Sequence, residues 1–111
     1  MSLASEELSD RIRSHLGLHP AVTEQKMFGG RCFMLNGNML VCPMKDGSLL
    51  VRSGKDGYDA ALALPGARPM TMGARTMSGF VEVTGDLLED DEVLLDWIEL
   101  ARSFVETLPA K

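Results

Sequence analysis

The chain has few cysteines, few aromatic residues and no long apolar run. Two cysteines, one tryptophan and one tyrosine occur among 111 residues. No apolar stretch approaches the roughly 20 residues that a membrane span requires, and the N-terminus lacks the pattern of a signal peptide. A chain of this length can bury roughly two thirds of its unfolded surface, so one core can form without disulfide or metal staples. The sequence therefore predicts one cytoplasmic domain that covers residues 1–111.

Positive charge is also scarce, and it is unevenly placed. The net charge is −5, and residues 86–111 hold eight acids against Arg102 and Lys111. Nucleic-acid binding needs a cationic face, so we expect no salt-sensitive binding to duplex DNA. The middle of the chain, by contrast, has an excess of basic residues. They could form a small anion site, or they could be merely solvated or ion-paired with the acidic last helix. The residues considered for an anion site are Lys26, Arg31, Arg52, Arg68 and Arg75.

The sequence contains no recognisable motif for catalysis or for binding a metal or cofactor. Its glycine-containing segments at 29–30 and 54–57 match neither the Walker pattern nor the dinucleotide fingerprint. Cys32 and Cys42 lack the four close ligands of structural zinc, and nothing in the sequence places a base beside either thiol. We therefore expect no catalytic residue, no metal and no cofactor, with both cysteines buried and reduced.

Helix signals occur in three places. Ser5, followed by two glutamates, predicts a helix start, and Leu8, Ile12 and Leu16 then form one apolar stripe before Gly17. A second helix is expected over 56–64. The last helix is expected to begin in the acidic run at 89–92. Its apolar positions, spaced by three and four, are Leu94, Trp97, Ile98, Ala101, Phe104, Val105 and Leu108.

Strand signals fill the rest of the chain. Residues 23–28 look extended and lead to Gly29 and Gly30, which suit a bulge or a close backbone contact. The Asn36-Gly37 dipeptide is a strong hairpin signal, and a turn at 46–47 leads to a further strand over 48–53. Two more strands are expected over 70–72 and 80–83. If the hairpin loop has three residues, Cys32 and Cys42 lie directly opposite each other.

Several segments resemble the N-terminal domain of the TfoX/Sxy regulators over nearly the whole chain. The segments that carry the resemblance are Lys26-Met27-Phe28-Gly29-Gly30, then Phe33, Asn36-Gly37-Asn38-Met39, Leu50-Val51-Arg52, Gly66-Ala67-Arg68-Pro69-Met70, Gly79-Phe80-Val81, Trp97 and Ala101. The resemblance implies a stand-alone member without the family's C-terminal domain. It also implies an α+β fold in two layers, an antiparallel sheet with helices in the order α-β(3)-α-β(2)-α, similar to the YgaC and secretion-chaperone group.

The resemblance further implies a small bacterial, non-catalytic regulatory or protein-interaction domain. The best-known members of the family help to switch on DNA uptake in natural competence, together with a cyclic-AMP-responsive transcription factor. A protein partner is therefore expected, with a transcription factor among the candidates. Two alternatives stay open: a binding module for a small anionic ligand that uses the basic cluster, and a thiol-dependent enzyme.

The two arms of the hairpin predict self-association. Every residue over 32–35 and 39–42 is apolar, so the sheet face away from the helices also carries apolar side chains. A large exposed apolar patch commonly marks an interface. We therefore expect a two-fold symmetric homodimer that buries part of this sheet and is disrupted by Leu40→Lys or Val41→Lys.

Overall fold

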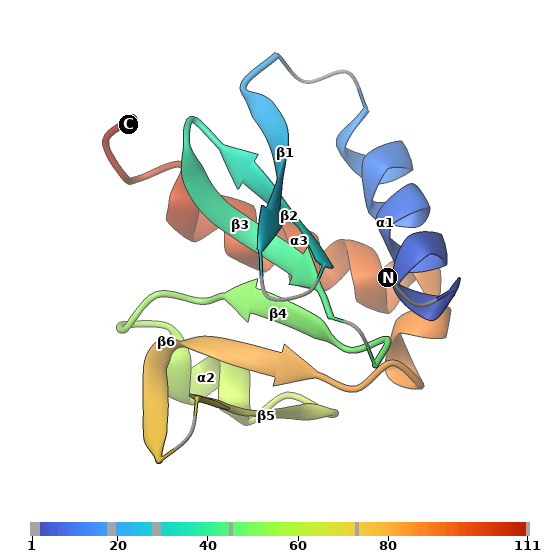
Figure 1. The fold of residues 1–111 in the computed structure, drawn as a ribbon. Coiled ribbons are helices and arrows are strands. Elements are labelled where there is room, and N and C mark those ends of the chain that lie inside the picture. Colours follow the sequence, from blue (N-terminus) through green and yellow to red (C-terminus); the bar gives the residue numbers. More distant parts are fainter. Residues whose placement is uncertain (1–2, 18–19, 28–29, 45, 73, 111) are drawn as a thin grey trace.

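Over residues 3–17, 20–27, 30–44, 46–72 and 74–110, the computed structural model describes a six-stranded antiparallel sheet with helices packed against it (Figure 1). The helices are α1 (Leu3–Leu16), α2 (Tyr58–Leu62), the 3-10 turn η1 (Leu87–Glu89) and α3 (Asp91–Val105). The strands are β1 (Val22–Met27), β2 (Gly30–Leu35), β3 (Asn38–Pro43), β4 (Leu49–Arg52), β5 (Ala67–Met72) and β6 (Arg75–Val83). Their order across the sheet is β1-β2-β3-β4-β6-β5.

This α+β architecture is the one predicted, with one strand more than the order that the resemblance implied. Within the described residues, four strands precede α2 instead of three. Strands β1 to β4 follow one another as a meander, whereas β6 pairs with β4 and leaves β5 at the edge. Strands β1 and β5 are therefore the two edges of the sheet, far apart from each other.

Helix α1 follows the predicted stripe but starts earlier than predicted. Leu8 and Ile12 are buried, and Leu16 packs against the same core. The helix ends at Gly17, which has a φ of 62° and donates its N–H to the Arg13 carbonyl at 2.9 Å. Such a left-handed residue is a common helix terminator. The predicted start was wrong, because the helix begins at Leu3 and Ser5 lies inside it.

The β2–β3 hairpin turns at Asn36 and Gly37, whose φ angles are 53° and 82°. Both values suit a tight two-residue turn that matches the twist of the strands. Met34 pairs with Met39, but Phe33 pairs with Val41, so the register shifts between these pairs. This shift inserts an extra residue in β3. From Phe33 toward the start of β2, the two strands therefore have the register that was expected from a three-residue loop.

The register shift brings Cys32 and Cys42 into contact. Both side chains are fully buried, as predicted, and both are free thiols. A hydrogen bond between the two thiols lowers the pKa of Cys32 and raises the pKa of Cys42, and burial raises the pKa of Cys42 further. The buried pair lacks the exposed, electropositive surroundings that activate a cysteine.

We expect both thiols to react slowly with a thiol reagent in the native protein. Because they are buried, reaction needs local or global opening of the sheet, so labelling should be roughly 100-fold or more slower than in denaturant. The measurement is the rate of modification with and without urea. Fast labelling of the folded protein would show that this part of the sheet opens readily.

The sheet carries apolar residues on both faces, and both groups are buried. The helix-side group includes Phe33, Leu49, Val51 and Val81, together with residues of α1 and α3. The opposite group, here called the sulfur cluster, is Cys32, Met34, Met39, Cys42, Leu50 and Met70, and each of its members is at most 8% exposed. Met44, Met77 and Phe80 pack against it.

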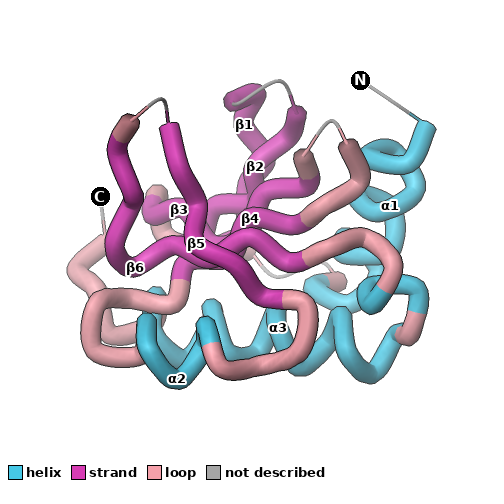
Figure 2. The backbone as a smooth tube through the Cα atoms, turned by 90° about the horizontal axis from the view of Figure 1, so that it is seen from below, coloured by secondary structure: helices cyan, strands magenta, loops and turns pink. Residues whose placement is uncertain are grey.

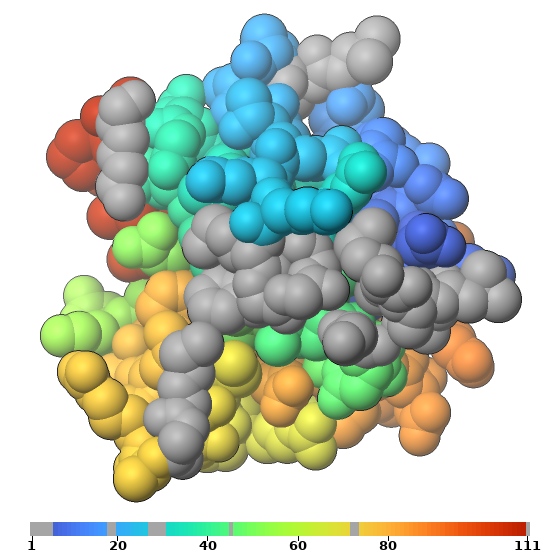
Figure 3. All heavy atoms as spheres, in the orientation of Figure 1, coloured from blue at the N-terminus to red at the C-terminus, as the bar shows by residue number. Residues whose placement is uncertain are grey.

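The sulfur cluster lies on the sheet face turned away from the helical layer, and each of its members is at most 8% exposed. Figure 2 shows the free ends of the β1–β2 and β5–β6 hairpins projecting away from the helical layer, so this face is concave. In Figure 3, β1 and β2 (blue to cyan) stand on one side of this face, with β5 and β6 (yellow to orange) on the other. The expectation that this face is open is therefore wrong for the sulfur cluster. Association of two copies stays a prediction.

Helix α2 differs at its boundaries from the sequence prediction, whereas α3 begins inside the predicted acidic run. Helix α2 is shorter than predicted and ends before Pro65 and Gly66. Helix α3 starts at Asp91, after η1, and the Asp90 carboxylate accepts the Glu92 N–H at 2.9 Å as an N-cap. The buried residues of α3 are Leu94, Trp97, Ile98, Ala101 and Val105, all of them predicted. None of the helices described here is long and apolar enough to cross a membrane.

Candidate functional site

The motif segment at 26–30 lies where β1 meets β2. The backbones of Met27 and Gly30 pair with each other, and Lys26 pairs with Arg31. Phe28 and Gly29 lie outside the described residues, and the side chain of Met27 is also not described. The structure therefore places this motif at a hairpin end, with Lys26 exposed on an edge strand.

The five basic residues considered for an anion site do not come together. Lys26 and Arg31 share the helix-side face near one edge of the sheet, whereas Arg68 lies on β5 at the other edge. Arg75 is exposed at the start of β6. Arg52 lies at the end of β4 and lines a pocket.

Two of the five are already paired with acids. Arg31 lies 3.6 Å from Glu24, which Arg13 also contacts at 2.7 Å. The hydrogen bond from Arg13 lowers the pKa of Glu24. Arg68 lies 2.8 Å from Glu82. These contacts are surface ion pairs, but their acids lie on β1 and β6 and not in the acidic last helix, where the alternative to an anion site had placed them.

A pocket of about 350 Å³, here called the arginine pocket, opens beside the end of β4. The Arg52 guanidinium lies 5.6 Å from the centre of the Phe80 ring and 5.8 Å from that of Phe104. Both distances suit a cation over an aromatic face. The pocket is lined by Arg52, Gly54, Lys55, Asp56, Ser78, Gly79, Phe80 and Phe104.

An apolar groove of about 420 Å³, here called the α2–α3 groove, lies between the end of α2, η1 and α3. It is lined by Leu64, Pro65, Leu87, Val93, Asp96, Trp97 and Leu100. Leu64 is 42% exposed and Leu87 is 36% exposed. They are two of the three exposed large hydrophobic residues in the described part of the chain, the third being Leu95. The sequence offered only a weak signal for this groove, an apolar residue before Pro65.

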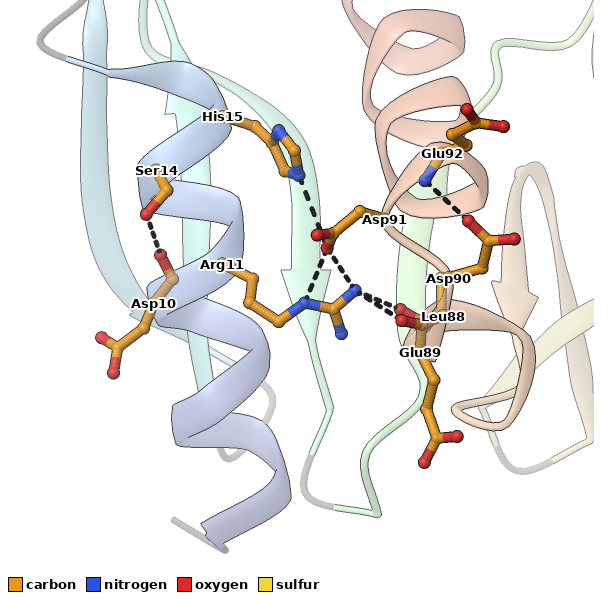
Figure 4. Close-up of polar contacts among 9 residues, drawn as sticks. All are labelled: Asp10, Arg11, Ser14, His15, Leu88, Glu89, Asp90, Asp91 and Glu92. Carbon is orange, nitrogen blue, oxygen red and sulfur yellow. Dashed lines mark hydrogen bonds and ion pairs between the residues drawn. The ribbon is translucent and has the colours of Figure 1, made fainter.

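Helix α1 is attached to the start of α3 by Arg11 (Figure 4). Its guanidinium donates to the Asp91 carboxylate at 2.7 Å and to the Leu88 carbonyl at 2.6 Å. The hydrogen bond from Arg11 lowers the pKa of Asp91, and His15 approaches the same carboxylate at 3.9 Å. The bond from Arg11 to the Leu88 carbonyl links α1 to η1, and η1 contributes Leu87 to the α2–α3 groove.

We expect Arg11→Gln to lower the free energy of unfolding by about 1 kcal/mol, mainly through the lost bond to the half-buried Leu88 carbonyl. The exposed pair with Asp91 adds little, because solvent screens it. Urea denaturation measures the change. Arg102→Gln is the matched control, because the partners of Arg102 among the described residues are Glu99 and Glu106, both within about one turn of it. An equal loss in both variants would contradict a specific role for Arg11.

The described residues hold no group of three or more His, Cys, Asp or Glu side chains that could bind a metal ion. The two candidate sites are therefore the arginine pocket and the α2–α3 groove. Both are built from segments far apart in the sequence. The arginine pocket carries charged side chains, among them Arg52 and Lys55, whereas the α2–α3 groove is lined mainly by apolar ones.

Comparison with known proteins agrees with the fold. No match was found among curated proteins. The sequence profile described as the TfoX N-terminal domain matches residues 14–105, from the last turn of α1 to the end of α3. The match includes every strand of the sheet and both candidate sites. The chain therefore belongs to the TfoX N-terminal domain family.

Proposed function

We propose that this domain is a non-catalytic regulatory module that binds a partner protein through the α2–α3 groove. The observation that carries the proposal is the exposure of Leu64 and Leu87 on the rim of an apolar groove that Trp97 lines. Soluble domains usually cover such side chains, and exposed apolar grooves commonly mark interaction sites. The family resemblance supports regulation in the cytoplasm and makes a transcription factor the first partner class to test.

The charge around the groove indicates the chemistry of the partner. Asp96 lines the groove, and Glu92 lies one turn earlier on the same exposed side of α3. Neither carboxylate has an ion-pair partner among the described residues, and no basic side chain lines the groove. An apolar groove with an acidic flank fits an amphipathic helix whose apolar side chains are bordered by Lys or Arg.

A peptide titration tests this choice, with Trp97 as the reporter. Trp97 is the only tryptophan in the chain, so its emission reports directly on the groove. The probes are two amphipathic helical peptides of about 15 residues without aromatic residues, one of Leu and Lys and one of Leu and Glu. We expect the basic peptide to shift the Trp97 emission saturably and the acidic peptide to leave it unchanged.

Two lysine substitutions separate groove binding from general charge attraction. Leu64→Lys places a cation on the groove rim, whereas Leu95→Lys adds the same charge at a similarly exposed site on α3 outside the groove. We expect Leu64→Lys to weaken basic-peptide binding by roughly tenfold and Leu95→Lys to weaken it far less. Equal weakening, or equal binding of both peptides, counts against the groove.

Sedimentation of the same variants tests the other occupant, a second copy of the chain. The proposal predicts that Leu64→Lys leaves the mass in solution unchanged. A dimer that dissociates only in Leu64→Lys would make the groove a homodimer interface and overturn its assignment to a partner protein.

A further inference from the structure

Arg52 is unusual among the arginines of this acidic chain. Five arginines in the described residues pair with carboxylates, and they are Arg11, Arg13, Arg31, Arg68 and Arg102. Arg52 has no carboxylate partner among the described residues, although it is half-buried in the wall of a pocket. Its guanidinium packs against the rings of Phe80 and Phe104. As far as the described residues go, its hydrogen-bonding edge has no acidic partner and can pair with a ligand.

The backbone around the pocket is fixed by two glycines. Gly54 and Gly79 have φ angles of 78° and 90°, which favour glycine. The N–H groups of Ser53 and Gly54 both donate to the Gly79 carbonyl, at 2.9 and 3.1 Å. These amides are therefore engaged within the protein. The polar side chains that line the pocket and can recognise a ligand include Arg52, Lys55 and Ser78.

The charges and the rings of the pocket define the ligand. Arg52 and Lys55 supply two positive charges and Asp56 one negative charge, so the lining has a net charge of +1. Phe80 and Phe104 add apolar surface next to the guanidinium. A guanidinium edge binds a carboxylate through two parallel hydrogen bonds, and ring faces accommodate an apolar body. The Asp56 carboxylate opposes a dianion.

We propose that the arginine pocket binds a small organic monocarboxylate with a planar or apolar body. Arg52, which packs against both rings, and Lys55 pair with the carboxylate, while Phe80 and Phe104 contact the body. A volume of about 350 Å³ is at the lower end of ligand pockets, which fits a molecule of this size. This site is separate from the α2–α3 groove, and it does not depend on the regulatory proposal.

Amide chemical shifts measured during titration with sodium benzoate test the proposal. Benzamide has the same shape without the charge, and inorganic phosphate has the charge without the ring. We expect saturable shifts at Gly54, Lys55, Ser78 and Gly79 with benzoate. Benzamide and phosphate should bind roughly tenfold or more weakly. Shifts that do not saturate, or equal binding of benzoate and benzamide, would overturn the proposal.

Single substitutions locate the binding site. Arg52→Gln and Lys55→Gln should each weaken benzoate binding by roughly tenfold. Arg31→Gln removes the same charge on β2, far from the pocket, and should leave the affinity unchanged. If Arg52→Gln does not fold, Lys55→Gln decides the question, because Lys55 is an exposed residue. Equal losses in Lys55→Gln and Arg31→Gln would show attraction to overall charge and exclude a site.

Discussion

A Val41→Lys variant is expected to be mostly unfolded. Val41 is fully buried in the helix-side core, where an ammonium group finds no partner. Burial of an unpaired charge destabilises a protein by several kcal/mol, and total stabilities of small domains are about 5–15 kcal/mol. We expect a loss of about 4 kcal/mol or more in the free energy of unfolding. Circular dichroism with urea denaturation measures it.

Leu95→Lys is the control for this experiment. Leu95 is 38% exposed on α3, so the same new charge stays in water and should change stability by less than about 1 kcal/mol. A folded Val41→Lys chain that changes only its mass in solution would contradict the burial described here. It would support the original expectation of an open face at this hairpin.

A Gly54→Ala variant is expected to lose about 2–4 kcal/mol of stability, for two physical reasons. Gly54 has a φ of 78°, which strains any residue with a Cβ. In addition, an ideal Cβ at this position lies 2.5 Å from the Phe104 ring, which must then move away from the loop. The measurement is the free energy of unfolding from urea denaturation.

Gly17→Ala separates the two reasons. Gly17 has a φ of 62°, but a Cβ there would have no atom of another described segment within 4 Å. It should therefore show only the backbone penalty, about 1 kcal/mol. The difference between the two variants gives the contribution of the Phe104 contact. Equal losses would show that Phe104 moves freely and does not form a fixed wall of the arginine pocket.

The sequence predicted those features that depend on neighbouring residues. Asn36 and Gly37 specify the hairpin because both tolerate positive φ angles. The spacing of Leu8 and Ile12 in α1, and of Trp97 and Ala101 in α3, identified the buried faces of these helices. Helix boundaries were less accurate, because capping signals such as Ser5 also occur inside helices.

The features that the sequence did not predict depend on contacts between distant segments. The sulfur cluster combines side chains from β2, β3, β4 and β5, a combination that no local pattern encodes. Arg52 was a candidate for the anion site, but the Phe104 ring that it contacts lies far from it in the sequence. The apolar stripe of α3, to which Phe104 belongs, indicated only core packing. The α2–α3 groove likewise combines Leu64, Leu87 and Trp97 from three separate elements.

The most direct test of the regulatory role is to compare transcripts among four versions of the native cell. They are the unmodified cell, a cell in which the gene is deleted, and cells that carry Leu64→Lys or Leu95→Lys. Immunoblots check that the two variants are present at equal levels. The account predicts that deletion alters a set of transcripts, that Leu64→Lys reproduces this change, and that Leu95→Lys matches the unmodified cell. A deletion without effect on transcripts, or a Leu64→Lys cell that matches the unmodified one, would contradict regulation through the α2–α3 groove.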